Sequence, residues 1–379
     1  MKRNAVLSAA LIAVLAFTLL TRTSGLHAEG GSGSGGGRGD GVGAPVDPDS
    51  FYTPSRMSAG ARPPQFVIVS FDGAGSHQKW EYWRSVGDAA GARFTGFLSG
   101  VYLVDGAHRT AYRGPGHRAG RSSLGYWLDA GEVRRLLDDL NAAWAKGYEI
   151  GTHFNGHFCS ADRPGADDWS TSDWNDELDQ FFRFYTGYKS IDQMADAPDL
   201  AASPESIRGA RTPCLEGKPA SLLPALRQHG FSYDTSQVAT GIAWPRKTTA
   251  GLWEFPLAYV PLAGTGSGVV SMDYNFWVKQ TGNPPSTRDP VGDSDQVLRT
   301  YRQMYRAAYD GNRAPLVLGN HFNDWNGGAY KMALSRFVTE TCRRPDTYCV
   351  PYRDVVRWME AQDPAVLADL QALPPVDTP

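Results

Sequence analysis

The chain has 379 residues, of which 41% are hydrophobic and 12% aromatic, enough for one large domain or two smaller ones with a sizeable core. Its 37 basic and 40 acidic residues give a formal net charge of −3. Because there is no excess of positive charge, we expect neither nucleic acid nor an anionic membrane as a partner. The expected oligomeric state is a monomer.

The N-terminus has the pattern of an export signal. Residues 1–28 begin with the positive stretch MKRN, continue with the apolar run AVLSAALIAVLAFTLL and end in Leu-His-Ala. The apolar run is short for a membrane span and suits a secretory signal cleaved after Ala28. An uncleaved anchor is the alternative, since Leu26 is larger than the residue preferred there. We expect a secreted or cell-surface protein with no other membrane contact.

Composition divides the rest of the chain into three parts. Residues 29–63 begin with the Gly/Ser-rich stretch EGGSGSGGGRGDGVGA, which predicts a flexible linker. The Arg-Gly-Asp triplet inside it is either a cell-adhesion motif or a chance product of this composition, and the composition favours chance. Residues 64–362 form the expected folded domain, and residues 363–379 the expected C-terminal tail.

The four cysteines are even in number in a chain that carries an export signal, which predicts two disulfides but leaves three pairings open. Cys342 and Cys349 flank a turn-like segment, so we pair them with each other and Cys159 with Cys214. The alternative is a Cys/His metal site that uses Cys159, although oxidation competes for exported thiols.

From residue 64 onward, strand-like and helix-like runs alternate in chain order. QFVIVSF (65–71) is a continuous apolar run typical of a buried strand, and 92–100 is the next candidate. The run 130–147 has apolar residues at helical spacing and ends at Gly147, which suits a C-cap. The other expected strands are 148–152, 206–212, 231–236, 315–319 and 347–352, and the other expected helices 221–229, 294–310 and 353–361. This alternation predicts a parallel α/β sheet, either open or closed into a barrel.

Polar residues follow the expected strands at their carboxyl ends, where reactive groups gather in such folds. They are Asp72, His153, His157, Arg211, Asp234 and His321. Although they are scattered in sequence, we expect them to lie together in space.

The motif GTHFNGH places His153 and His157 four residues apart directly after a strand. This spacing puts both imidazoles on one face of a helical turn, and neutral imidazole suits zinc and similar divalent ions. Packing in the core is the alternative for this pair.

The remaining polar residues suggest acid–base chemistry. Asp72 is either a turn cap or a carboxylate that faces a pocket. Arg211 either anchors a loop or stabilises ionised Asp72 through paired hydrogen bonds. His321 is either a core histidine or a proton donor with Asp234 as its carboxylate partner. Trp325 is expected to stack on a sugar ring or to pack in the core.

Five motifs in chain order carry a family resemblance: FVIVSFDG, GTHFNGH, RTPC, YDTS and LVLGNH. They resemble the motif set of the polysaccharide deacetylases, the NodB-homology family also called carbohydrate esterase family 4. The segments WEFPL and YCVPYRDVVRWM look most like its chitin-deacetylase-like branch. The resemblance covers about residues 64 to 360. It implies a distorted (β/α) barrel of parallel strands with outer helices, and an exported enzyme that removes acetyl groups from an N-acetylated polysaccharide such as chitin or peptidoglycan.

The resemblance also implies a role for each matched residue. It makes Asp72 the catalytic base, Arg211 the support of that base, His321 the general acid and Asp234 the residue that tunes the acid. It makes His153 and His157 ligands of a divalent metal, expected to be zinc, which polarises the acetamide carbonyl and a bound water.

Two positions depart from the family pattern. Gly73 stands where the family has a second aspartate, the third metal ligand, so metal affinity is expected to be weaker than usual or lost. Cys214 stands where a tyrosine is common, but the backbone N–H expected to stabilise the oxyanion survives this change. The functional alternatives are a catalytically silent glycan-binding module and an esterase that acts on O-acetyl groups.

Overall fold

The computed structural model describes residues 51–58 and 60–378. The expected signal segment, the Gly/Ser-rich tract and its Arg-Gly-Asp triplet lie outside these residues. Within the described ranges, no helix combines the length and hydrophobicity that a membrane crossing needs.

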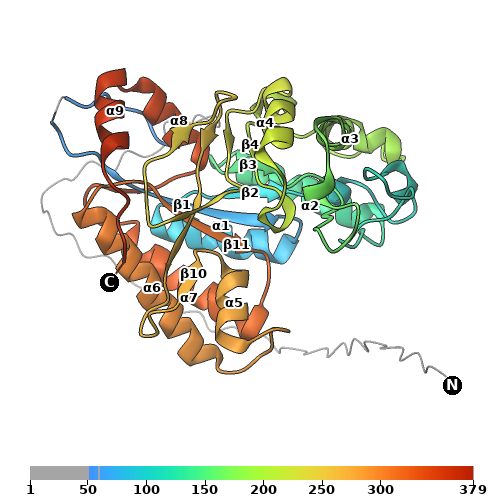
Figure 1. Ribbon diagram of the computed structural model, residues 1–379. Coiled ribbons are helices and arrows are strands. Elements are labelled where there is room, and N and C mark those ends of the chain that lie inside the picture. The colour runs from blue at the N-terminus through green and yellow to red at the C-terminus, as the bar shows by residue number, and fades with distance from the viewer. Residues whose placement is uncertain (1–50, 59, 379) are drawn as a thin grey trace, which may run out of the picture. The chain divides into compact units, whose positions relative to one another are not determined.

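A curled sheet of mostly parallel strands forms the centre of the domain (Figure 1). The strand order is β11-β1-β2-β3-β4-β5-β8-β7, with β12 paired to β1, and only the β7–β8 pair is antiparallel. The strands are β1 (Gln65–Gly73), β2 (Thr95–Leu98), β3 (Glu149–Thr152), β4 (Gly209–Ala210), β5 (Tyr233–Asp234), β7 (Arg246–Lys247), β8 (Trp253–Glu254), β11 (Leu316–His321) and β12 (Thr347–Cys349).

Helices surround this sheet (Figure 1). They are α1 (His77–Ala90), α2 (Ala130–Trp144), α3 (Thr171–Ile191), α4 (Pro219–Gln228), α5 (Asp273–Thr281), α6 (Pro290–Asp310), α7 (Trp325–Thr341), α8 (Tyr352–Ala361) and α9 (Pro364–Ala372). A short 3₁₀ helix, η1 (Gly100–Leu103), follows β2. The expected α/β fold with parallel strands and outer helices is therefore confirmed, as a curled sheet that forms a half-barrel.

A second, three-stranded sheet lies beside the free edge of β11. It consists of β6 (Val238–Thr240), β9 (Leu257–Pro261) and β10 (Gly268–Val270), in the order β10-β9-β6. An isolated bridge joins Met272 to Gly319 of β11, and the Gly319 N–H donates to the Ser271 carbonyl at 2.9 Å. The connection from this sheet into α5 therefore runs directly past the carboxyl end of β11.

The amphipathic pattern of the sequence explains the core. Strand β1 is buried over eight of its nine positions, as its continuous apolar run predicts. Helix α2 turns Val133, Leu136, Leu137 and Leu140 inward, and the Asp129 side chain caps its first turn.

The two disulfides are paired as the sequence predicts. Cys159 is bonded to Cys214 and Cys342 to Cys349. The first ties the loop after β3 to the loop after β4, at the end of the sheet where the predicted site residues gather.

Several predicted strands are shorter than the runs that predict them. The run 206–212 contains only the two-residue strand β4, and 231–236 only β5. Both runs end in polar residues that hydrogen-bond to the neighbouring loop instead of extending the ladder. The Ser236 hydroxyl, for example, accepts a hydrogen bond from the Thr212 N–H at 3.0 Å.

Candidate active site

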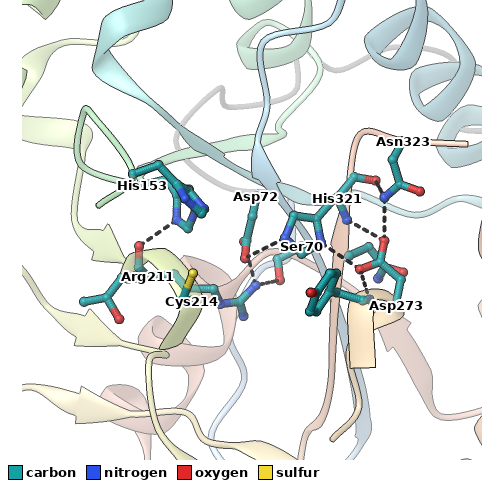
Figure 2. Close-up of polar contacts among 12 residues, drawn as sticks. Ser70, Asp72, His153, Arg211, Cys214, Asp273, His321 and Asn323 are labelled. Atoms are coloured by element: carbon teal, nitrogen blue, oxygen red, sulfur yellow. Dashed lines mark hydrogen bonds and ion pairs between the residues drawn. The ribbon is translucent and has the colours of Figure 1, made fainter. Parts of the chain in front are cut away.

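Four of the predicted residues come together at the carboxyl ends of the strands (Figure 2). Asp72 and His321 are register partners on adjacent strands β1 and β11. His153 directly follows β3, and Arg211 directly follows β4. A cavity of about 330 Å³ is lined by Asp72, His321 and both histidines of the GTHFNGH motif.

The Asp72 carboxylate is held by the buried Arg211 guanidinium. Arg211 Nη1 donates to Asp72 Oδ1 at 2.9 Å, and both side chains are almost fully buried. Burial by itself raises the pKa of Asp72, but Arg211 and the nearby histidines outweigh it, so the pKa is lowered. Asp72 is therefore an anion at neutral pH, and its Oδ2 faces His321 Nε2 at 4.0 Å.

Arg211 makes a single hydrogen bond to Asp72 and not the paired bonds expected from the sequence. Its other donors go to Ser70 Oγ at 2.8 Å, Tyr352 Oη at 2.8 Å and the Thr235 backbone and side chain at 3.2 and 3.1 Å. The guanidinium is thus fixed on several sides, which compensates for burying its charge. One oxygen of Asp72 consequently remains open to the cavity.

His153 has the hydrogen bonding expected of a metal ligand. Its Nδ1 lies 2.8 Å from the Arg211 carbonyl, which can only accept, so the proton is on Nδ1. Its Nε2 is buried and has no hydrogen-bond partner among the described residues. Burial lowers the pKa of His153 to about 3, so the ring is neutral and the Nε2 lone pair is available.

His157 lies beside His153, with the ring centroids 5.1 Å apart. Burial lowers its pKa also. Its backbone has φ +55°, so the two histidines are placed by a left-handed residue and not by the helical turn that the spacing suggests. Cys159 Sγ lies 3.7 Å from His157 Nδ1, but this sulfur belongs to the disulfide with Cys214 and offers no thiolate to a metal.

The carboxylate that contacts His321 is Asp273, which the sequence analysis missed, and not Asp234. His321 Nδ1 lies 2.7 Å from Asp273 Oδ1, and the His321 N–H donates to Oδ2 at 2.8 Å (Figure 2). Asn323 Nδ2 also donates to Oδ2, at 2.9 Å. Burial lowers the pKa of His321, but Asp273 outweighs it, so the pKa is raised. The signal for Asp273 was its place at the start of a helix, in SMDYNFW.

Asp234 lies instead on β5, opposite Glu254 of β8 in the strand register. Its Oδ1 accepts a hydrogen bond from Ser236 Oγ at 2.6 Å. Burial raises the pKa of both Asp234 and Glu254, and their mutual repulsion adds to the rise in Glu254. Asp234 is therefore placed beside Glu254 inside the sheet and not beside the ring of His321.

The space beside Gly73, where a third metal ligand was expected, contains Tyr102 of η1. A Cβ atom on Gly73 would lie 3.8 Å from Tyr102 Cε2 and 4.0 Å from its hydroxyl. Gly73 has φ +85°, a conformation that L-residues disfavour. Burial raises the pKa of Tyr102, so its phenol is neutral and acts as a hydrogen-bond donor and acceptor at the cavity wall.

The side chains present fit a divalent ion in part. The orphaned Nε2 of His153 and the neutral ring of His157 are suitable nitrogen ligands, and the free Oδ2 of Asp72 is the nearest carboxylate oxygen on β1. Gly73 stands where an aspartate ligand was expected. Asp72 could replace this ligand only by binding the ion through the oxygen that would otherwise accept a proton.

Trp325 lies in the cavity wall. Its ring centroid is 4.9 Å from that of His321, and it stacks on Trp277 at 4.9 Å with an interplanar angle of 16°. Tyr274, with 42% of its surface exposed, packs edge-on against the same ring. The residues that line an adjoining cavity of about 450 Å³ include Tyr274, Trp325 and Cys214.

Neither a scan against protein-family models nor a search of curated proteins found a match. Solved structures do match. One described as a polysaccharide deacetylase from Mycobacterium smegmatis is 15% identical, with a TM-score of 0.48, and the match covers 86% of this chain and 98% of that one. PuuE allantoinase is 14% identical, with a TM-score of 0.47 and coverage of 82% and 98%.

A mutant of a CE4 family pseudoenzyme from Bacillus anthracis, with restored enzymatic activity, also matches. It is 10% identical, with a TM-score of 0.40 and coverage of 81% of this chain and 73% of that one. At such identities and TM-scores these matches support no conclusion about activity. The descriptions of two of these matches name a polysaccharide deacetylase and a member of carbohydrate esterase family 4.

Proposed function

We propose that this protein is a hydrolase that removes acetyl groups from an N-acetylated polysaccharide. The observation that carries the proposal is the pair formed by Asp72 and His321 across the cavity. The two side chains face each other at 4.0 Å, and each has a separate buried partner, Arg211 or Asp273. The lowered pKa of Asp72 and the raised pKa of His321 suit a base and an acid that work in the same pH range.

The proposed reaction adds water to the acetyl carbonyl and breaks the C–N bond. Asp72 Oδ2 accepts a proton from the attacking water, and His321 Nε2 donates a proton to the departing amine. The products are acetate and a free amino group on the sugar. The backbone N–H of Cys214, at the edge of the adjoining cavity, is the proposed donor to the developing oxyanion.

A divalent ion, of which zinc suits the two imidazoles, would be held by His153 and His157, which leaves Asp72 Oδ2 to act as the base. When bound, such an ion polarises the carbonyl and lowers the pKa of a bound water. The departure at Gly73 leads us to expect weaker binding than three dedicated ligands would give.

The substrate class is supported by the aromatic cavity wall. Trp325, Trp127 and Tyr102 present ring faces and edges next to the acid–base pair, as sugar-binding sites commonly do. Two disulfides are compatible with export, and we propose that the protein acts outside the cell as a monomer.

The second candidate is a glycan-binding module without catalysis, which the glycine at position 73 favours. The same acid–base pair also suits O-acetyl substrates, from which an alcohol leaves in place of an amine.

Acetate release distinguishes these functions. The metal-supplemented full chain is incubated with chitin oligomers, peptidoglycan and acetylated xylan. We expect release from an N-acetylated substrate that a chelator and His153→Ala both abolish. Binding to these glycans without acetate from a folded, metal-supplemented protein would identify the silent module, and acetate from xylan alone the esterase.

A further inference from the structure

A second group of one imidazole and two carboxylates lies apart from the residues of the catalytic cavity. This loop cluster consists of Asp105 and His108, which follow η1, and Asp192, the C-cap residue of α3. One potential ligand atom from each residue lies within 4.8 Å of the other two. Asp105 and Asp192 are 5% and 4% exposed. The His108 side chain is 30% exposed, so the cluster has one edge open to solvent.

The hydrogen bonds of the loop cluster leave one carboxylate oxygen unsatisfied. Asp105 Oδ1 lies 3.0 Å from His108 N and 2.9 Å from His108 Nδ1, and Asp192 Oδ2 accepts from Asp105 N at 3.0 Å. Asp192 Oδ1 is buried and has no hydrogen-bond partner among the described residues. Its nearest polar contact is His108 Nδ1 at 3.5 Å, a nitrogen already directed at Asp105. Buried oxygens without a partner are rare and costly.

The electrostatic setting of Asp192 also calls for a positive charge. Asp105 and Asp192 are both buried, and each has a carboxylate oxygen near the same His108 nitrogen. Asp192 caps the C-terminus of a 21-residue helix, where the helix dipole is negative and cations are favoured. Two buried carboxylates therefore lie near a helix C-terminus, where the helix dipole disfavours their negative charge.

We propose that Asp105, His108 and Asp192 form a second metal site, for zinc or a similar divalent transition ion. His108 Nδ1 and one oxygen of each carboxylate are the ligands, and the open edge leaves room for water. The distances of 2.9 and 3.5 Å from Nδ1 to the two oxygens bracket the spacing of about 3.3 Å between ligands in a tetrahedral zinc site. The imidazole selects such ions over calcium and magnesium, which take oxygen ligands.

Gln193 provides the outer partner that this site needs. Ligation through Nδ1 places the ring proton of His108 on Nε2, where an acceptor is required. The Gln193 side-chain amide lies 3.4 Å from Nε2, with its nitrogen facing the ring. A half-turn of the amide presents its oxygen to this proton.

The site would tie the end of α3 to the wall of the catalytic cavity. Asp105 pairs with Trp127 in a parallel bridge, and the Gly106 N–H donates to the Trp127 carbonyl at 2.8 Å. Tyr102 precedes Asp105 by three residues, and both Tyr102 and Trp127 line the cavity. An ion at the loop cluster therefore orders the two aromatic residues that a substrate meets.

Zinc binding by the full chain tests the site in a variant that lacks the two histidines of the catalytic cavity. The His153→Ala/His157→Ala variant, stripped by a chelator, is titrated with zinc, and bound metal is measured by mass spectrometry. We expect about one equivalent, which is lost when His108→Gln or Asp192→Asn is added. Asp196→Asn is the matched control, since this aspartate on the same segment has a side chain that is 84% exposed.

Two further measurements separate the site from an effect on folding. Zinc at about 100 times its Kd should raise the Tm of the background variant by about 4 °C and leave that of the Asp192→Asn variant unchanged. Zinc should also slow hydrogen exchange at residues 99–108 and 126–128. If the background variant does not fold, wild type is compared with Asp192→Asn, and a loss of one equivalent is expected.

Equal zinc binding with and without Asp192→Asn, or no binding by a folded background variant, would overturn the proposal. If zinc binds at the loop cluster but no acetate is released, the result contradicts the proposed catalytic function and leaves the second metal site standing.

Discussion

His321 and His108 each lie between two buried aspartates, but the two surroundings differ in how the ring is used. The carboxylates around His321 face opposite nitrogens, with Asp273 at 2.7 Å from Nδ1 and Asp72 at 4.0 Å from Nε2. Both carboxylates around His108 face the same nitrogen, at 2.9 and 3.5 Å. The first arrangement can hold and pass on a proton, whereas the second leaves an oxygen that a proton on Nδ1 cannot satisfy.

The difference also extends to the other partners of the carboxylates. Arg211 neutralises Asp72, and Asp273 accepts hydrogen bonds from His321, Asn323 and the Tyr274 N–H. No comparable cation among the described residues faces Asp192 except His108 itself. A histidine between two aspartates can therefore serve different functions. The other hydrogen-bond donors and cations that contact each carboxylate determine which function the histidine has.

Asp72→Asn should have the largest effect on acetate release, because it removes the proposed base. The substitution leaves the loop cluster intact. We expect kcat for acetate release to fall by about 10³-fold, within the range for loss of general base catalysis. Zinc binding at the loop cluster should not change. Asp295→Asn, on the exposed face of α6, is the control. Activity within tenfold of wild type would show that Asp72 is not the base.

Asp273→Asn should lower kcat by about 10- to 100-fold and shift the pH profile. Asp273 raises the pKa of His321, and His321 must be protonated to act as the acid. Without this carboxylate the pKa falls, so the basic limb of the kcat profile moves to lower pH. Asp234→Asn is the control and should leave that limb in place. A shift with Asp234→Asn alone would restore the role that the sequence suggested for it.

Gly73→Asp tests whether an aspartate at position 73 increases the zinc affinity of the site formed by His153 and His157. The substituted residue must adopt a left-handed backbone, so we expect a loss of about 1–2 kcal/mol in the free energy of unfolding. Gly73→Ala carries the same strain without a carboxylate and is the matched control. In an Asp192→Asn background, zinc affinity should be about tenfold higher for Gly73→Asp than for Gly73→Ala. Equal affinities would mean that Tyr102 keeps the carboxylate away from the ion.

Much of the catalytic group could be predicted because parallel strands bring their carboxyl ends together. Asp72 is the penultimate residue of β1 and His321 the last residue of β11. His153 and Arg211 directly follow β3 and β4, and the sequence predicted a strand at each of these four places. Asp273 was missed because it follows an antiparallel strand of the small sheet, whose contact with β11 depends on the Met272–Gly319 bridge. No periodicity in the sequence predicts such a bridge between two sheets.

The loop cluster could not be predicted for a related reason. Asp105 and Asp192 are 87 residues apart, Asp105 in an irregular segment and Asp192 at the C-terminal end of α3. Their contact depends on where α3 ends relative to η1, which tertiary packing decides. Helices α1, α3, α5, α7 and α9 were also not predicted, and α3 shows why. Its many buried aromatics, among them Trp174, Phe181 and Tyr185, are as typical of strands as of helices.

Trp325→Ala should have the smallest effect on activity, because it changes only the wall of the cavity that contains Asp72 and His321. The Trp325 ring lies 4.9 Å from that of His321 and stacks on Trp277. Loss of one stacking face should lower kcat/KM for chitin oligomers by about fivefold, mainly through KM, because an aromatic stack is worth about 1 kcal/mol. Trp325→Phe should recover most of the loss. If kcat falls and KM does not, Trp325 positions His321 and does not bind the sugar, and the acid would then depend on packing as well as on Asp273.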